Sequence, residues 1–176
     1  MKLFCKIAIV LIASCMAVSC NGSKNLADSE TTPAETTIPC SENGKSDGEF
    51  FRASANATSS SISLSREKAV AAAKSELAKT IINRVLIASK QYANETGHPD
   101  KATFIKDMEL VANKAIDQSL IGISPICENY SETNGRYTTY IAVEIGKDAI
   151  INKICSLATK QISNFDTEKF KNIFTE

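Results

Sequence analysis

The side chains of this 176-residue chain that could do chemistry are six cysteines and a single histidine. His98 stands in the turn-like stretch Gly97-His98-Pro99-Asp100, and one imidazole cannot build a multi-histidine metal site. A general base also needs an aligned nucleophile and a pocket, so we interpret His98 as a solvated loop residue. No two cysteines have the Cys-x-x-Cys spacing of zinc and redox sites. We therefore expect no catalytic residue, no metal site and no cofactor.

Cys20 has the most specific surroundings of the six cysteines. Residues 1–20 read MKLFCKIAIVLIASCMAVSC, in which lysines precede an apolar run at 7–13 and small residues precede Cys20. The run is shorter than the about 20 apolar residues of a spanning helix, so it fits a signal peptide. The end of the segment resembles a bacterial lipobox. That resemblance implies cleavage after residue 19, a diacylglycerol on the Cys20 thiol and an acyl chain such as palmitate on the new amino group. The alternative is an ordinary secretory signal with an incidental cysteine. Cys15 fits less well as the lipidated residue, because only a very short apolar run would precede it.

A lipidated Cys20 would make the membrane the first partner of the chain, because two or more acyl chains hold a protein stably on a bilayer. Asn21 follows the cysteine where Asp would favour the inner membrane, so the resemblance to lipoprotein sorting signals implies the outer membrane. We expect a lipid-anchored protein of the bacterial cell envelope.

The charge balance excludes one class of partner. The chain has 20 basic and 20 acidic residues, and removing residues 1–19 takes away two lysines and no acid. Nucleic-acid binders normally show a basic excess to pair with phosphates, so we expect no nucleic-acid partner.

Composition divides the rest of the chain into two parts. Residues 20–47 are dominated by Ser, Thr, Asn, Glu, Pro and Gly without apolar periodicity, which is typical of a segment that cannot offset its ordering entropy. We interpret this part, which contains Cys40, as a flexible tether. Residues 48–176 show regular apolar patterns and are expected to form a single domain.

The patterns of that domain predict an α+β fold. Alternation over 51–58 predicts a strand, and apolar residues three and four apart predict a helix that begins after Ser65 as its N-cap and ends at Gly97. Further segments are expected as a helix at 101–120, strands at 123–130 and 137–145, a helix at 147–163 and a short last turn capped by Asp166. The order strand-helix-helix-strand-strand-helix indicates a three-stranded, mainly antiparallel sheet with helices packed on one face.

Asn134-Gly135 fixes the expected register of the second and third strands, because a type I′ turn needs two positive φ values. In that register Ile126 faces Val143, Tyr130 faces Thr139 and Cys127 faces Ala142. The face that carries Ile126, Tyr130, Ile141 and Val143 is the expected core.

The same register bears on Cys40, Cys127 and Cys155. An exported chain can form disulfides, but Cys127 would lie on the sheet face away from the core, while the helix with Cys155 should cover the core face. We therefore expect separate thiols, with a Cys127–Cys155 bond as the alternative.

Several apolar segments resemble the twenty-kilodalton outer-membrane lipoprotein family, to which flagellar-assembly lipoproteins are close. They are Phe51-Arg52-Ala53-Ser54-Ala55, the Ala-rich helix after Arg66, Ser119-Leu120-Ile121-Gly122 and Arg136-Tyr137-Thr138-Thr139-Tyr140-Ile141-Ala142-Val143. Ala-Asn stands where relatives usually have Gly after the first strand. The resemblance implies an envelope lipoprotein with a small α+β domain and carries over no catalytic residue.

These observations predict a non-enzymatic structural or protein-interaction role in the envelope, with an envelope protein or a second copy as partner. The expected interaction surface is the open sheet face or edge around Ile123, Pro125 and Tyr140, where exposed apolar side chains would meet a partner. A lipid-anchored module that binds a small molecule or a glycan is the alternative.

Overall fold

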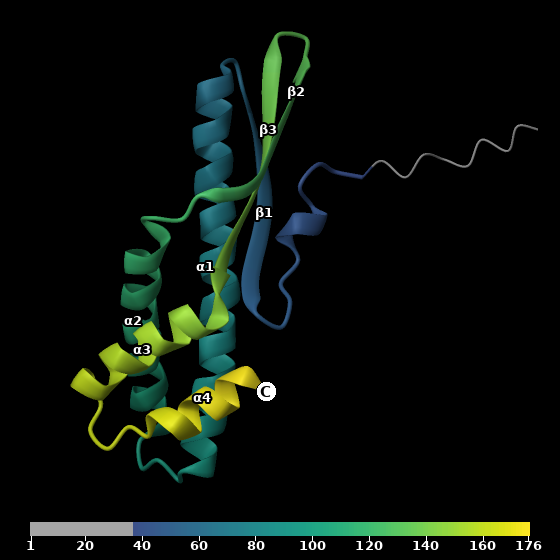
Figure 1. Ribbon diagram of the computed structural model, residues 1–176. Coiled ribbons are helices and arrows are strands. Elements are labelled where there is room, and N and C mark those ends of the chain that lie inside the picture. Colours follow the sequence, from purple (N-terminus) through teal and green to yellow (C-terminus); the bar gives the residue numbers. More distant parts are fainter. Residues whose placement is uncertain (1–36) are drawn as a thin grey trace, which may run out of the picture. The chain divides into compact units, whose positions relative to one another are not determined.

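The computed structural model describes residues 37–176, so the expected signal peptide, Cys20 and the first part of the expected tether lie outside the described residues. Within this range a turn of 3₁₀ helix at Glu42–Gly44 precedes three strands and four α-helices in an α+β fold. The elements are β1 (Phe50–Ser59), α1 (Ile62–Glu95), α2 (Lys101–Leu120), β2 (Pro125–Thr133), β3 (Arg136–Gly146), α3 (Lys147–Gln161) and α4 (Thr167–Thr175). The predicted fold class and order of elements are confirmed (Figure 1).

The three strands form one antiparallel sheet in the order β1-β3-β2. Asn134 and Gly135 have φ values of 52° and 71°, as the predicted two-residue turn requires. The pairs Tyr130–Thr139 and Cys127–Ala142 are confirmed, but an irregularity between Pro125 and Cys127 places Pro125, not Ile126, opposite Val143. Proline has no N–H to donate to a neighbouring strand, which fits the position of Pro125 at this irregularity on the edge strand β2.

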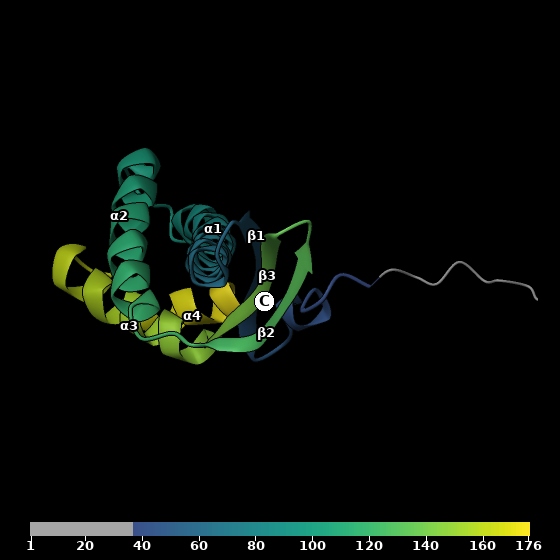
Figure 2. The ribbon, with the colours of Figure 1, turned by 90° about the horizontal axis from the view of Figure 1, so that it is seen from above.

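Helix α1 is the central element of the fold. Figure 2 shows it with the sheet on one side and α2 on another. Its buried stripe includes Ala73, Leu77, Ile81 and Val85, as the periodicity predicts. The helix begins one turn earlier than expected, because the hydroxyl of Ser61, not that of Ser65, accepts the N–H of Leu64.

The small side chains of β1 allow α1 to lie close to the sheet. Phe51 and Ala53 are buried, and Ala55 and Ala57 are partly buried against the same core. Helix α1 makes its most extensive contacts with this strand. The alternation of alanine with polar residues along β1 therefore reflects a helix packed on one face.

Helices α2, α3 and α4 complete the core around the second half of α1. Asp100 and Asp166 cap α2 and α4 by accepting the N–H groups of Thr103 and Lys169, and the second of these caps was predicted. Tyr92 on α1 ties these helices together, because its ring stacks on Phe104 and its hydroxyl accepts the N–H of Asp166. Helix α3 ends at Gln161, before the predicted end, because Ile162 is already extended.

Strand β2 lies beyond the part of the sheet that α1 covers (Figure 2). Ile141 and Val143 on β3 are fully buried, as predicted, whereas Ile126 and Tyr130 are 41% and 60% exposed. The expectation that Ile126 and Tyr130 belong to the core is therefore wrong. The alternation of side chains is as expected, but one helix is too narrow to cover a third strand.

Candidate functional site

The cysteine pairing differs from both readings of the sequence. Cys40 and Cys127 form a disulfide with their Cα atoms 5.6 Å apart, and Cys155 is a free, buried thiol on α3. Separate thiols were expected, and Cys127–Cys155 was the alternative, so both are corrected. Cys127 does lie on the sheet face away from the helices, as predicted, and the partner comes from the segment before β1.

Residues 37–47, which we call the strap, lie against the sheet and were assigned to the tether on composition. The strap crosses one row of the sheet, in which Cys127, Ala142 and Ser54 are paired across β2, β3 and β1. Cys40 is bonded to Cys127 at one end of the row, and Gly44 lies on Ser54 at the other. Ala142 between them is fully buried although it points away from the helices.

Gly44 has a steric role in this crossing. A Cβ atom at position 44 would lie 2.5 Å from the Cβ of Ser54 and 2.7 Å from its backbone nitrogen. Only glycine lets the strap approach β1 so closely.

Ser46 and Asp47 fasten the end of the strap to β1. The Ser46 hydroxyl accepts the N–H of Arg52 and donates to its carbonyl, so it occupies backbone groups of the strand. Asp47 accepts the N–H groups of Glu49 and Phe50 and pairs with the Arg52 guanidinium, which also holds Glu144 on β3 at 2.7 Å. The backbone N–H groups of Phe50 and Glu49, and then Arg52, lower the pKa of Asp47 to about 2.

The three residues of the expected interaction surface contact different parts of the molecule. Ile123 packs against the core, and Pro125 is half-buried at the start of the edge strand. Tyr140 lines a cavity of about 140 Å³ together with Ile38 and Pro39 of the strap. The sheet face that was expected to be open is thus partly covered by the chain itself. Cys20, the expected lipidation site, lies outside the described residues.

An exposed surface remains where the start of α1 meets β2. Arg66 on α1 and Glu128 on β2 are joined by an ion pair of 2.7 Å. Ile62 lies one helical turn before Arg66, and Tyr130 lies two residues after Glu128 on the same face of the strand. Both apolar side chains are more than two-fifths exposed. We call Ile62, Arg66, Glu128 and Tyr130 the hairpin surface. The alternation of β2 marked Tyr130, but only the tertiary structure shows that it is uncovered.

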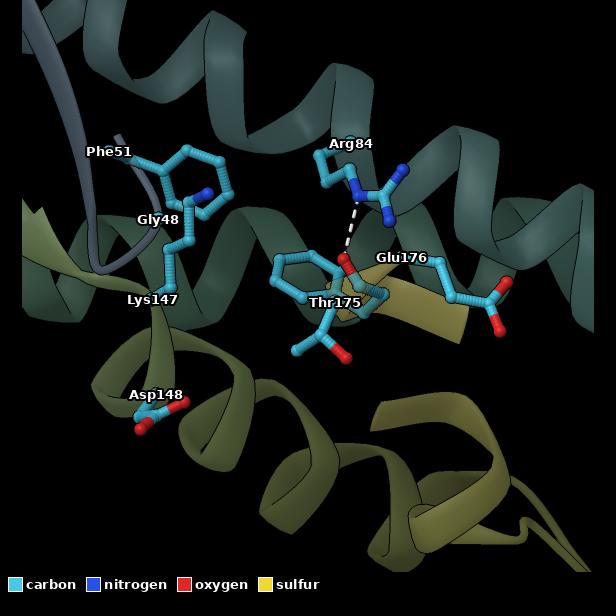
Figure 3. A pocket seen from close by; sticks show the side chains of 8 residues that line it. Gly48, Phe51, Arg84, Lys147, Asp148, Thr175 and Glu176 are labelled. Carbon is cyan, nitrogen blue, oxygen red and sulfur yellow. Dashed lines mark hydrogen bonds between the residues drawn. The ribbon is translucent and has the colours of Figure 1, made fainter. Parts of the chain in front are cut away.

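A second candidate site is a pocket of about 160 Å³ where β1, α1 and the ends of α3 and α4 meet (Figure 3). The rings of Phe51 and Phe174 meet edge to face in its wall. Arg84 donates to the carbonyls of Ile173 and Phe174 at the end of α4. The ammonium of Lys147 lies 5.2 Å from the centre of the Phe51 ring, and Asp148 and Glu176 also line the pocket.

His98 is not a freely solvated loop residue as expected. Its ring centre lies 4.9 Å from that of Phe104, and its Nδ1 lies 3.0 Å from the carbonyl oxygen of Asp100. The ring is half-buried and helps to close the turn between α1 and α2.

Residues 37–176 contain neither a candidate metal site nor a candidate membrane span. Among these residues no three His, Cys, Asp or Glu side chains lie close enough together to hold a metal ion. None of the helices in the same range has the length and apolarity that crossing a membrane requires.

Comparison with known proteins found no matching family, curated protein or solved structure.

Proposed function

We propose that the chain is a lipid-anchored protein of the bacterial envelope, with an acylated Cys20 and a domain that makes a non-enzymatic protein contact. The observation that carries the proposal is the Cys40–Cys127 disulfide. Disulfides persist in oxidising compartments and are rare where thiol reductants keep cysteines reduced. This agrees with a chain that is exported behind the signal-like segment 1–19.

The hairpin surface is the part of the domain that we propose for the protein contact. Tyr130 presents an aromatic ring that is 60% exposed, beside the charges of Arg66 and Glu128. Aromatic residues and arginine are enriched where proteins meet, and the rim of such contacts is polar. The partner is an envelope protein or a second copy of the chain.

Cross-linking in intact cells tests this assignment. We expect the wild-type chain to give a defined cross-linked product on electrophoresis and Tyr130→Asp to reduce it at least fivefold. Leu110→Asp is the matched control, because Leu110 on α2 is 59% exposed but lies outside the hairpin surface. Equal yields from Tyr130→Asp and the wild type would contradict the assignment of this surface.

A further inference from the structure

Two of the attachments that hold the strap to the sheet differ in their chemistry. Ser46 and Asp47 hold its second half through hydrogen bonds and the ion pair with Arg52. Cys40 holds its first half through a covalent bond to β2. A thiol reductant breaks only the second of these attachments.

The backbone at Cys40 favours release once the bond is broken. Cys40 has a φ of 61°, in the left-handed region that side chains other than glycine, asparagine and aspartate rarely adopt. Cys40 is buried on the sheet, so the disulfide holds an unfavourable backbone conformation in place. A reduced Cys40 is free to return to an ordinary φ, which moves its side chain off Cys127.

Cys155, the remaining cysteine of residues 37–176, does not compete in this exchange. Cys155 lies on α3, which packs on the helical side of the sheet, whereas the disulfide lies on the opposite side. Burial raises the pKa of its thiol to about 11, so little nucleophilic thiolate forms near neutral pH. The pair Cys40–Cys127 therefore opens and closes without rearranging to Cys155.

We propose that the Cys40–Cys127 bond is a redox-operated lock on the strap, and that its reduction uncovers the sheet face at Tyr140 and Ala142 while the domain stays folded. The reductant is a dithiol. Its two thiols become one disulfide, the Cys40–Cys127 bond breaks, and the two protons end on the Cys40 and Cys127 thiols. The turn at Ser46 and Asp47 stays in place and serves as the hinge.

Hydrogen exchange on the full chain, with and without the dithiol dithiothreitol, tests the proposal. In the reduced protein the amides of Ser41 and Gly44, which donate within the strap, should exchange at least tenfold faster. Amides of β3 opposite β1 should keep their protection. The double variant Cys40→Ser/Cys127→Ser should behave like the reduced protein without any reductant, and Cys155→Ala should behave like the oxidised wild type.

Hydroxyl-radical footprinting gives a second readout at the covered face. Oxidation of Tyr140 should rise at least twofold on reduction, while Tyr130, which is exposed in the oxidised protein, serves as the internal reference. Unchanged exchange at Ser41 would overturn the proposal, because the strap would then be held without the disulfide. Loss of protection throughout β3 would overturn it as well, because the disulfide would then be required for the whole domain to stay folded.

Discussion

Asp47 fixes the start of β1 through its charge. Its carboxylate accepts two backbone N–H groups and pairs with Arg52, and these contacts lower its pKa to about 2. A carboxyl group with a pKa lowered by folding stabilises the native state above its unfolded pKa of about 3.9, and this contribution is lost as the pH falls through the folded value.

We therefore expect Asp47→Asn to remove part of the acid sensitivity of the domain. The difference in melting temperature between wild type and variant should shrink between pH 4 and pH 2, because the Asp47 carboxyl of the unfolded chain becomes protonated there while that of the folded chain stays largely ionised. Thermal melts followed by circular dichroism measure it, with Asp107→Asn on the exposed face of α2 as control. A difference that stays constant from pH 7 to pH 2 would refute the role of the Asp47 charge.

Alkylation of Cys155 tests which of the cysteines in the domain is a free thiol. Its burial raises its pKa to about 11, so iodoacetamide at pH 8 should label it very slowly in the folded protein. After denaturation without reductant, mass spectrometry of a chain beginning at residue 21 should show one label. Three labels would mean that Cys40 and Cys127 are not bonded.

At the scale of elements, one buried pair of hydroxyl groups joins α1 to β3. The Oγ of Ser65 and the Oγ1 of Thr139 lie 2.7 Å apart, and both residues are buried. The Ser65 hydroxyl also donates to the carbonyl oxygen of Ile62 at 2.9 Å, so it accepts the hydrogen bond from Thr139. Ser65 therefore keeps a hydrogen bond to Ile62 if the Thr139 hydroxyl is removed, whereas removing the Ser65 hydroxyl takes away the hydrogen-bond partner of Thr139.

This asymmetry predicts the outcome of a double-mutant cycle. Ser65→Ala should lower the free energy of unfolding by about 1–3 kcal/mol, because it leaves the Thr139 hydroxyl buried without that partner. Ser65→Ala/Thr139→Val should recover most of the loss, since no polar group then remains unsatisfied. Urea unfolding measures both variants, and strictly additive losses would contradict the coupling.

Local patterns predicted the elements more accurately than their partners. The bounds of α2, the turn at Asn134-Gly135 and the cap at Asp166 depend on residues close in sequence, and all three are as expected. The strap was missed because its polar composition gives no signal, and its attachment joins Cys40 to a residue 87 positions away. The alternation of β2 predicted the sheet face on which Tyr130 lies, but not that its side chain is exposed. Exposure depends on how much of the sheet α1 covers, which is a property of the tertiary structure.

For the domain as a whole, the disulfide closes a separation of 87 residues. Cross-linking restricts the unfolded chain, so Cys40→Ser/Cys127→Ser should lower the free energy of unfolding by about 2–4 kcal/mol. A domain of this size is stable by about 5–15 kcal/mol, so the variant should remain folded. Urea unfolding measures the loss, and a change below about 0.5 kcal/mol would show that the bond does not constrain the unfolded chain.

We propose that the chain is exported, anchored by lipid at Cys20 and carries this disulfide-closed domain. Intact mass spectrometry of the full-length gene product, extracted from bacterial membranes in mild detergent, tests it most directly. We expect a chain that begins at Cys20, carries a diacylglycerol and an amide-linked acyl chain, and is two hydrogens lighter than the fully reduced form. A chain that retains residues 1–19, or one with an unmodified Cys20 and reduced Cys40 and Cys127, would contradict it.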